Sequence, residues 1–240
     1  MADRAPSQGN PPGAAVFLPV ADAYDRWSGL YDSYDNPMVF AATAVIRAGL
    51  AGTPGWDVRG ADVVEFGCGT GRNLAMLKAH GARTLVGCDL SVGMLAKARA
   101  RDAAFRLLRH DMAEPLPLPD ASADLVLFCL SLEHVGDPGA PLREARRLLR
   151  PSGRVAVIEI HPFVSQGGVS AHFRDEAGEV RMPTFAHRFC DHLNAFAGAG
   201  LRVDACREWR PRDLGPSVPA KVLKRGPDVP LVVEFSAVPF

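Results

Sequence analysis

Three glycines at alternate positions, Gly67, Gly69 and Gly71, follow an apolar run at residues 63–66 and precede a helical pattern that begins near Arg72. Glycine tolerates positive φ, and it lets a ligand approach the main chain with no Cβ in the way. The free N–H groups at the start of a helix attract an anionic or carboxylate-bearing group. The spacing therefore predicts a ligand site built from the backbone.

The second chemical signal is an acid, Asp89, which ends another apolar run at residues 84–88. An acid at this position can accept hydrogen bonds from both hydroxyls of a ribose. A dinucleotide fingerprint requires a third small residue where the chain has Arg72, so the pattern disfavours a nicotinamide cofactor. The alternative is an ordinary glycine loop followed by an aspartate that caps a helix.

The segments V-E-F-G-C-G-T-G-R-N at 64–73, G-C-D-L-S-V-G-M-L at 87–95 and L-L-R-P-S-G-R-V at 148–155 resemble class I S-adenosylmethionine-dependent methyltransferases. The resemblance covers about residues 24–160 and is strongest to the small-molecule, type 11-like subgroup. It implies a Rossmann-like α/β fold whose mostly parallel seven-stranded sheet carries helices on both faces. It also implies S-adenosylmethionine as the cofactor.

By this resemblance, Asp89 binds the ribose and Asp111 the adenine amino group, while Leu90 and Met112 lie against the adenine ring. A solvated turn aspartate is the alternative for Asp111. The full set expected to bind the cofactor comprises Tyr24, Tyr31, Glu65, Gly67, Cys68, Gly69, Gly71, Arg72, Asn73, Asp89, Leu90, Met94, Asp111, Met112 and Cys129.

All three tyrosines lie in one aromatic segment together with Trp27. The resemblance implies that this segment, about residues 20–36, is an N-terminal lid that places Tyr24, Trp27 and Tyr31 against the cofactor. An amphipathic helix packed on the domain is the alternative. Residues 1–18 are rich in proline, glycine and polar residues, which predicts a disordered tail before one domain at 19–240.

The elements that position these residues follow from hydrophobic periodicity. Helical spacing is expected at 37–50, after 72 and after 91, and strands at 62–65, 84–88, 106–109, 123–128 and 154–160. Successive strand–helix units predict a parallel sheet with right-handed crossovers. A last helix is expected at 185–199 and last strands at 201–209 and 231–235, one of them antiparallel to the rest by the resemblance.

Candidate catalytic residues follow from the position of the site. Ligands of open α/β sheets lie at the carboxyl ends of strands where the strand order reverses, which directs attention to Glu133, His134 and His161. Methyl transfer needs an aligned donor and acceptor and, for some acceptors, a base. We expect His161 as the first candidate, with His134, Glu133 and Tyr31 as the others. Alternatively, His134 orients the next helix and His161 caps its strand.

The segment 161–196 departs from the rhythm of the sheet and is expected to cap the acceptor site. Its arginines and histidines slightly favour an acidic or phenolic acceptor. We expect a phenolic, carboxylic or amine metabolite with O- or N-methylation; C-methylation, a nicotinamide-dependent oxidoreductase and a non-catalytic homologue are the alternatives. His172, His187 and His192 lack the spacing of metal ligands, so no metal is expected.

Composition limits the partners. The 240 residues have a formal net charge of zero, which disfavours nucleic acid. The five cysteines show no C-x-x-C spacing, so they are expected to be reduced thiols. The sequence shows no signal peptide and no apolar stretch of membrane-spanning length, and with its arginine-rich composition it predicts a cytoplasmic bacterial protein. Its oligomeric state is open.

Overall fold

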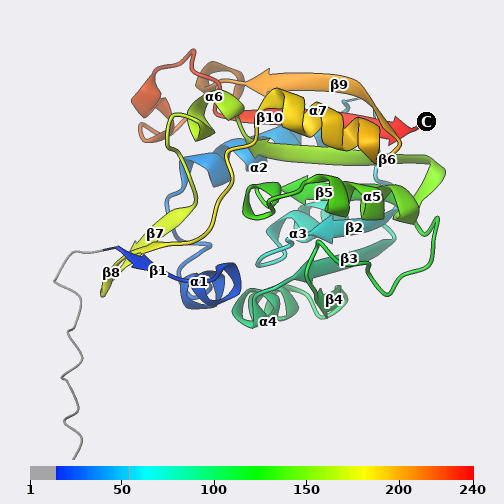
Figure 1. Ribbon diagram of the computed structural model, residues 1–240, viewed down its shortest axis with the longest axis horizontal. Coiled ribbons are helices and arrows are strands. Elements are labelled where there is room, and N and C mark those ends of the chain that lie inside the picture. Colours follow the sequence, from blue (N-terminus) through cyan, green and yellow to red (C-terminus); the bar gives the residue numbers. More distant parts are fainter. Residues whose placement is uncertain (1–14, 54) are drawn as a thin grey trace, which may run out of the picture.

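A computed structural model describes residues 15–53 and 55–240, and its centre is a seven-stranded sheet of order β4-β3-β2-β5-β6-β10-β9 (Figure 1). Pairing is parallel from β4 through β6, and β10 runs antiparallel to both of its neighbours. The mostly parallel seven-stranded sheet is therefore confirmed. The strands are β2 (Asp62–Phe66), β3 (Thr84–Asp89), β4 (Arg106–Arg109), β5 (Ala123–Cys129), β6 (Leu149–Ile160), β9 (Leu201–Trp209) and β10 (Val232–Pro239).

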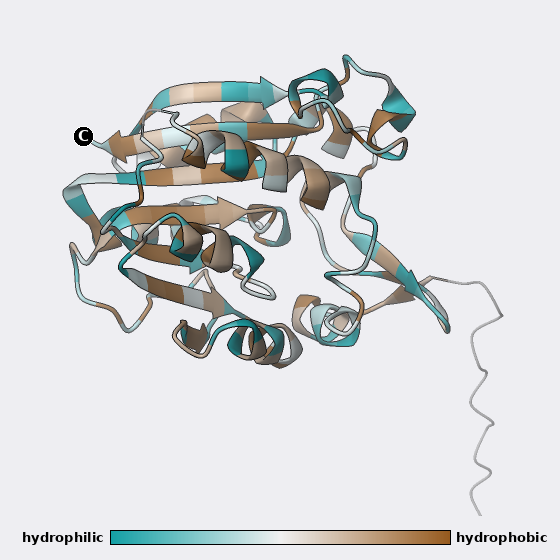
Figure 2. Cartoon of the chain, turned by 180° about the vertical axis from the view of Figure 1, so that it is seen from behind, coloured by the Kyte–Doolittle hydropathy of each residue, from teal (hydrophilic) through white to brown (hydrophobic). Residues whose placement is uncertain are grey.

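Helices cover both faces of the sheet because alternate strand residues point to opposite sides. Val63 and Leu125 pack on the side of α2 and α3, whereas Val64 and Val126 pack on the side of α5 and α7. Brown, apolar colour runs along the central strands in Figure 2. The helices are α1 (Val20–Trp27), α2 (Pro37–Leu50), α3 (Arg72–Ala79), α4 (Val92–Arg101), α5 (Gly139–Leu148), α6 (Pro162–Ser165) and α7 (Phe189–Gly198).

A three-stranded sheet of order β1-β8-β7 lies with α1 near the carboxyl ends of the parallel strands (Figure 1). Its strands are β1 (Val16–Phe17), β7 (His172–Asp175) and β8 (Gly178–Arg181). The expected disordered tail is wrong in its last residues, because β1 pairs in parallel with β8 and the Leu18 N–H donates to the Arg181 carbonyl at 3.0 Å. The rest of that prediction, residues 1–14, lies outside the described residues.

Three boundaries differ from the sequence-based expectation. Helix α7 begins at Phe189 rather than 185, where Asp191 Oδ2 accepts a hydrogen bond from the Arg188 N–H at 2.8 Å. On this helix Leu193 is 45% exposed, whereas Phe196 is buried. Strand β6 begins at Leu149 rather than 154, with an irregular register against β5. Strand β10 continues to Pro239 because its last residues pair with β9.

No helix in the described part of the chain has both the length and the hydropathy needed to cross a bilayer.

Candidate active site

Two adjoining cavities lie at the carboxyl ends of the central strands. The first, about 460 Å³, is lined by Gly67, Gly69 and Asp89 and is called the glycine-loop cavity below. The second, about 320 Å³, is lined by aromatic side chains and Glu133 and is called the aromatic cavity. Tyr24, Tyr31 and Leu130 line both. These volumes suit small-molecule ligands, whose sites typically measure about 300–1,000 Å³.

The three glycines of the loop all have positive φ, of 67°, 53° and 72°, but they serve different purposes. A Cβ on Gly67 would lie 2.6 Å from the Cβ of Ser131, so the loop itself requires glycine there. A Cβ on Gly69 would meet no described atom within 4 Å and would face open space. A Cβ on Gly71 would lie 3.1 Å from Ala98 and Phe105, and Gly71 does not line the cavity. Helix packing therefore explains why glycine is needed at 71, and the cofactor contact expected there stays a prediction.

Asp89 connects the end of β3 to the glycine loop. Its Oδ2 accepts a hydrogen bond from the Gly69 N–H at 2.8 Å, and its Oδ1 accepts one from the Ser91 N–H at 2.9 Å. Burial raises the pKa of this carboxyl group. Each carboxylate oxygen has a second lone pair, so Asp89 can accept further hydrogen bonds from a ligand in the cavity.

The far end of the glycine-loop cavity contains the residues expected around adenine. Leu90, Met94, Asp111 and Met112 all line it, although they come from three different segments. Asp111 is exposed, and its Oδ1 accepts a hydrogen bond from the Ala113 N–H at 2.9 Å. The structure thus brings one carboxyl group and several apolar side chains to the same end of the cavity.

Four other expected residues lie behind the glycine loop and do not line either cavity. Glu65 is fully buried, and its Oε1 accepts a hydrogen bond from Asn73 Nδ2 at 2.7 Å. Its Oε2 has no partner among the described residues, and burial raises its pKa to about 8, although nearby Asn73 and Arg72 oppose this. The Cys68 side chain is buried against Gly87, and the cofactor contact expected at Cys68 stays a prediction.

Helix α1 is joined to the domain through the carboxylates of the lid. Asp25 Oδ1 accepts hydrogen bonds from Ser91 Oγ at 2.5 Å and the Gly93 N–H at 2.7 Å. Asp32 accepts hydrogen bonds from Thr70 Oγ1 at 2.7 Å and Arg101 Nη2 at 2.5 Å. These contacts link the lid to the glycine loop and to the start of α4.

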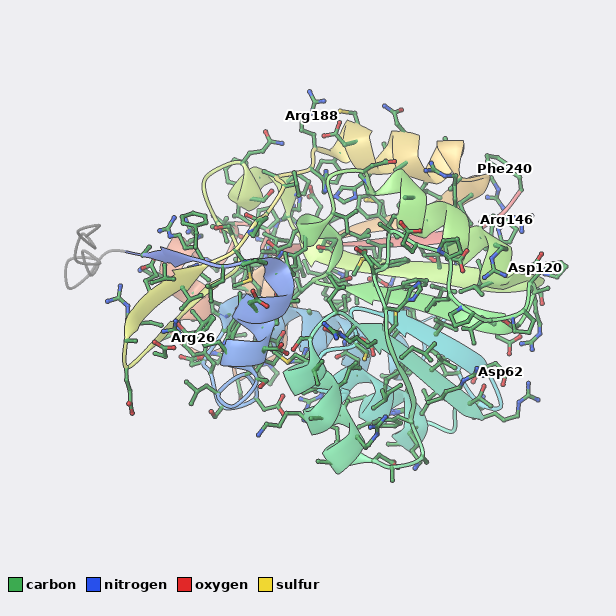
Figure 3. The ribbon with its side chains drawn as sticks, turned by 60° about the horizontal axis from the view of Figure 1, so that its bottom comes forward. Arg26, Asp62, Asp120, Arg146, Arg188 and Phe240 are labelled. Atoms are coloured by element: carbon green, nitrogen blue, oxygen red, sulfur yellow. The ribbon has the colours of Figure 1, made fainter. Side chains whose placement is uncertain are left out.

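An ion pair links α1 to the small sheet. Arg26 Nε lies 2.6 Å from Asp175 Oδ2, and Figure 3 shows Arg26 at the end of the molecule opposite Asp62. Tyr24 and Tyr31 belong to the segment that the sequence predicts to be a lid, and both line the two cavities where these meet.

His134 lines the glycine-loop cavity and forms a neutral pair with Tyr24. Its Nδ1 lies 2.9 Å from the Pro183 carbonyl oxygen and must donate a hydrogen bond to it. Nε2 therefore accepts a hydrogen bond from the Tyr24 hydroxyl group, also at 2.9 Å. Burial lowers the pKa of His134 and raises that of Tyr24. Both ring nitrogens are therefore engaged, which leaves His134 less suited to act as a base than expected.

Glu133 lines the aromatic cavity, and its pKa is raised to about 8. Burial is the main cause and the nearby Glu159 the second, whereas the Ala171 N–H opposes the shift. Burial also raises the pKa of Tyr31 to about 12, so this hydroxyl stays neutral. Glu133 is thus a carboxyl group that changes charge near neutral pH inside the cavity.

Sequence analysis missed Glu159 and Leu130. Glu159 Oε1 accepts hydrogen bonds from the N–H groups of Ser131 and Leu132 at 2.9 and 2.8 Å, which fixes the loop after β5. An acid inside the apolar run 155–160 was the available signal. Leu130 has a φ of 54°, which is uncommon for a non-glycine residue, and it lines both cavities.

The structure contradicts the expected role of His161 as the base. Within the described chain, His161 lines neither cavity, whereas Ile160, one residue earlier, lines the aromatic cavity. The His161 Nδ1 accepts a hydrogen bond from the Phe163 N–H at 3.1 Å, and Nε2 donates to Glu208 Oε1 at 3.0 Å. Side chains alternate along a strand, so the ring points to the other side and caps α6.

Parts of the segment 161–196 form walls of both cavities, but its arginines do not. His172 lines the aromatic cavity, and Phe185 lines the glycine-loop cavity. Arg174 and Arg181 instead form ion pairs with Glu179. Arg188 likewise pairs with Asp191. The arginine argument for an acidic or phenolic acceptor therefore fails.

Comparisons with known proteins identify the family. Residues 64–157 match the methyltransferase domain family of type 11. A malonyl-[acyl-carrier protein] O-methyltransferase of Serratia marcescens is 37% identical over 194 residues, which are 80% of this chain and 67% of that protein. The chain belongs to the S-adenosylmethionine-dependent methyltransferases. The expected family, fold, enzyme class and cofactor are confirmed.

Two further relatives show how far this likeness extends. A demethylmenaquinone methyltransferase of Clavibacter sepedonicus is 32% identical over 160 residues, 64% of this chain and 62% of that protein. A solved S-adenosylmethionine-dependent methyltransferase of Mesorhizobium loti aligns with a TM-score of 0.66 and 26% identity over 81% of this chain and 97% of its own. This methyltransferase thus spans about two thirds of the length of the curated relatives.

Proposed function

We propose that this methyltransferase binds S-adenosylmethionine in the glycine-loop cavity and methylates a small molecule held in the aromatic cavity. The observation that carries the proposal is the junction of the two cavities at Tyr24, Tyr31 and Leu130. A methyl group can pass between two ligands only where their sites meet. The acceptor is a phenolic, carboxylic or amine metabolite, so methylation takes place on oxygen or nitrogen.

The residues of the glycine-loop cavity fit this cofactor. The open side of Gly69 admits the methionine half of the cofactor. Asp89 holds the ribose, and Asp111 with Met112 holds the adenine. The cofactor supplies a methyl group on a sulfonium, which is transferred by in-line displacement.

The residues of this chain align the acceptor, exclude water and take up a proton where the acceptor has one. The lid, fixed through Asp25 and Asp32, covers the junction of the cavities. Glu133 is the candidate base, because it lines the aromatic cavity and its pKa of about 8 suits proton transfer near neutral pH. Tyr31 stays neutral and contributes shape and a hydroxyl group.

The test is a thermal-shift measurement followed by an activity screen. S-adenosylhomocysteine should raise the melting temperature and NADH should not. Labelled cofactor should then transfer its methyl group to at least one member of a panel of phenols, carboxylic acids and amines. Binding without any transfer would favour the non-catalytic alternative, and stabilisation by NADH alone would contradict the cofactor assignment. The bacterial, cytoplasmic origin suggested by composition stays a prediction.

A further inference from the structure

Four aromatic rings gather on one wall of the aromatic cavity. Trp27 lies at their centre, with ring centroids 5.6 Å from Tyr24, 4.9 Å from Tyr31 and 5.5 Å from Tyr34. All four residues line the cavity. Trp27 is buried and stacks with Tyr24 and Phe173, so it supports the wall, and the tyrosine rings are the ones that can meet a ligand. The face of an aromatic ring carries partial negative charge and attracts cations, so these rings suit an ammonium group.

The same cavity is also lined by an acidic group. Glu133 lines it, and Glu159 lies close enough to raise the pKa of Glu133. Among residues 15–53 and 55–240, neither carboxyl group forms an ion pair within 4.0 Å. A cationic acceptor would supply the missing positive partner and favour the ionised form of Glu133, whereas an acceptor with a carboxylate here would disfavour that ionisation further.

The mouth of the cavity has the opposite charge. Lys221, Lys224 and Arg225, on and beside the 3₁₀ turn η3 (Val222–Arg225), line it. Lys221 is engaged with Asp35 and lies over the ring of Tyr34. Lys224 and Arg225 are exposed and have no ion pair in the described part of the chain. Two cationic side chains are therefore available to an anionic group that enters by this route.

We propose that the acceptor is a primary or secondary amine that carries a carboxylate or phosphate at its other end. The amine lies between Glu133 and the aromatic wall, and the anionic group lies at Lys224 and Arg225. This inference rests on the proposed function and selects one of its three acceptor classes.

The reaction balances with the residues present. The incoming ammonium group gives one proton to the carboxylate of Glu133 and becomes a neutral amine. The nitrogen lone pair then forms the N–C bond to the methyl carbon while the S–C bond breaks and the sulfur keeps its electron pair. The products are a methylated ammonium ion and S-adenosylhomocysteine, and the Glu133 proton passes to solvent when the product leaves.

The test compares three variants with matched substrates. The panel holds amines with a carboxylate or phosphate, the same amines without the anionic group, and phenols and carboxylic acids that lack nitrogen. The variants are Glu133→Gln, Lys224→Ala combined with Arg225→Ala, and the control Arg146→Ala. Arg146 lies on α5, far from the lid, in Figure 3, and it has no ion pair among the described residues.

Anionic amines should be methylated best by the unchanged enzyme. Glu133→Gln should lower kcat by about 10²–10⁴-fold, which is typical for loss of a general base. The double variant should raise KM for anionic amines roughly tenfold and leave KM for the amines without an anionic group unchanged. A tenfold change corresponds to about 0.7 kcal/mol for each of the two lost ion pairs at exposed side chains. The control should match the unchanged enzyme on every substrate.

Binding of S-adenosylhomocysteine is measured for the unchanged enzyme and for each variant. If the unchanged enzyme does not bind S-adenosylhomocysteine, the proposed function is overturned and not this inference alone. With cofactor binding intact, the inference is overturned if phenols or carboxylic acids are methylated faster than every anionic amine. It is also overturned if Glu133→Gln keeps full kcat, or if the double variant affects substrates with and without the anionic group alike. Failure of every amine both to bind the S-adenosylhomocysteine complex and to be methylated overturns it as well.

Discussion

Gly69→Val tests whether the glycine loop exists to admit a ligand. Gly69 has a φ of 53°, and a Cβ there would meet no described atom within 4 Å, so the added side chain enters the cavity. Valine at this φ costs about 1–2 kcal/mol of backbone strain. For a chain of this size, that loss lowers the melting temperature by roughly 2–8 °C. The variant should still fold, but the valine side chain should fill the space for the methionine half of the cofactor.

Gly60→Val is the matched control. Gly60 has a φ of 71°, a Cβ there would also meet no described atom within 4 Å, and it lies just before β2, outside both cavities. S-adenosylhomocysteine at about 100 times its Kd stabilises by about 2.7 kcal/mol, or roughly 5–11 °C. The control should keep this shift, and Gly69→Val should lose it. If the two variants have the same melting temperature without ligand and S-adenosylhomocysteine raises both melting temperatures equally, the loop is not the cofactor site.

Three further outcomes are expected. Asp89→Asn should weaken S-adenosylhomocysteine binding by one to two orders of magnitude, as calorimetry would show, because a charge-assisted contact typically contributes about 1.5–3 kcal/mol; unchanged affinity would remove Asp89 from the site. His161→Ala should cost about 1 kcal/mol of stability as a lost helix cap while kcat stays within twofold, and a hundredfold fall in kcat would restore His161 as the base. The raised pKa values of Glu65 and Glu133, both about 8, and Glu159, about 7, mean that the folded protein holds these protons more tightly than the unfolded chain. The lowered pKa values of His134, His161 and His192 have the opposite effect below about pH 6.5, so the free energy of unfolding without ligand should fall as pH rises from about 7 to about 8. Denaturant unfolding of Glu65→Gln should show a shallower fall, and an unchanged slope would contradict the pKa shift of Glu65.

The central sheet and the cofactor half of the site could be predicted because their signals are local. Apolar runs at the length of buried strands, separated by helical patterns, fix the strand–helix order. Gly69 and Asp89 lie at the ends of two successive strands, so adjacent parallel pairing brings them together. Their contact, the hydrogen bond from the Gly69 N–H to Asp89, needs no information beyond that pairing.

The acceptor half could not be predicted to the same degree, because a shift of one residue along a strand reverses which side chain faces the cavity. His161 and Ile160 differ by that single step. The role of Glu159 depends on a loop 28 residues earlier that offers it two N–H groups. The pairing of Val16 with β8 likewise depends on a partner more than 150 residues away, which composition near residue 16 does not report.

The same difference explains how relatives can share a cofactor and carry names that specify different acceptors. The residues proposed to bind the cofactor come from consecutive strand–turn–helix units, where backbone geometry leaves few alternatives. The aromatic cavity is assembled from five separate segments, at 24–39, 130–133, 160, 168–172 and 221–231. The segments 168–172 and 221–231 line only the aromatic cavity, so they can change without altering the lining of the glycine-loop cavity, whereas Tyr24, Tyr31 and Leu130 line both. Glu133 and Lys224 line the aromatic cavity and not the glycine-loop cavity, so the acceptor must be sought from the charges of the aromatic cavity rather than from the names of the relatives.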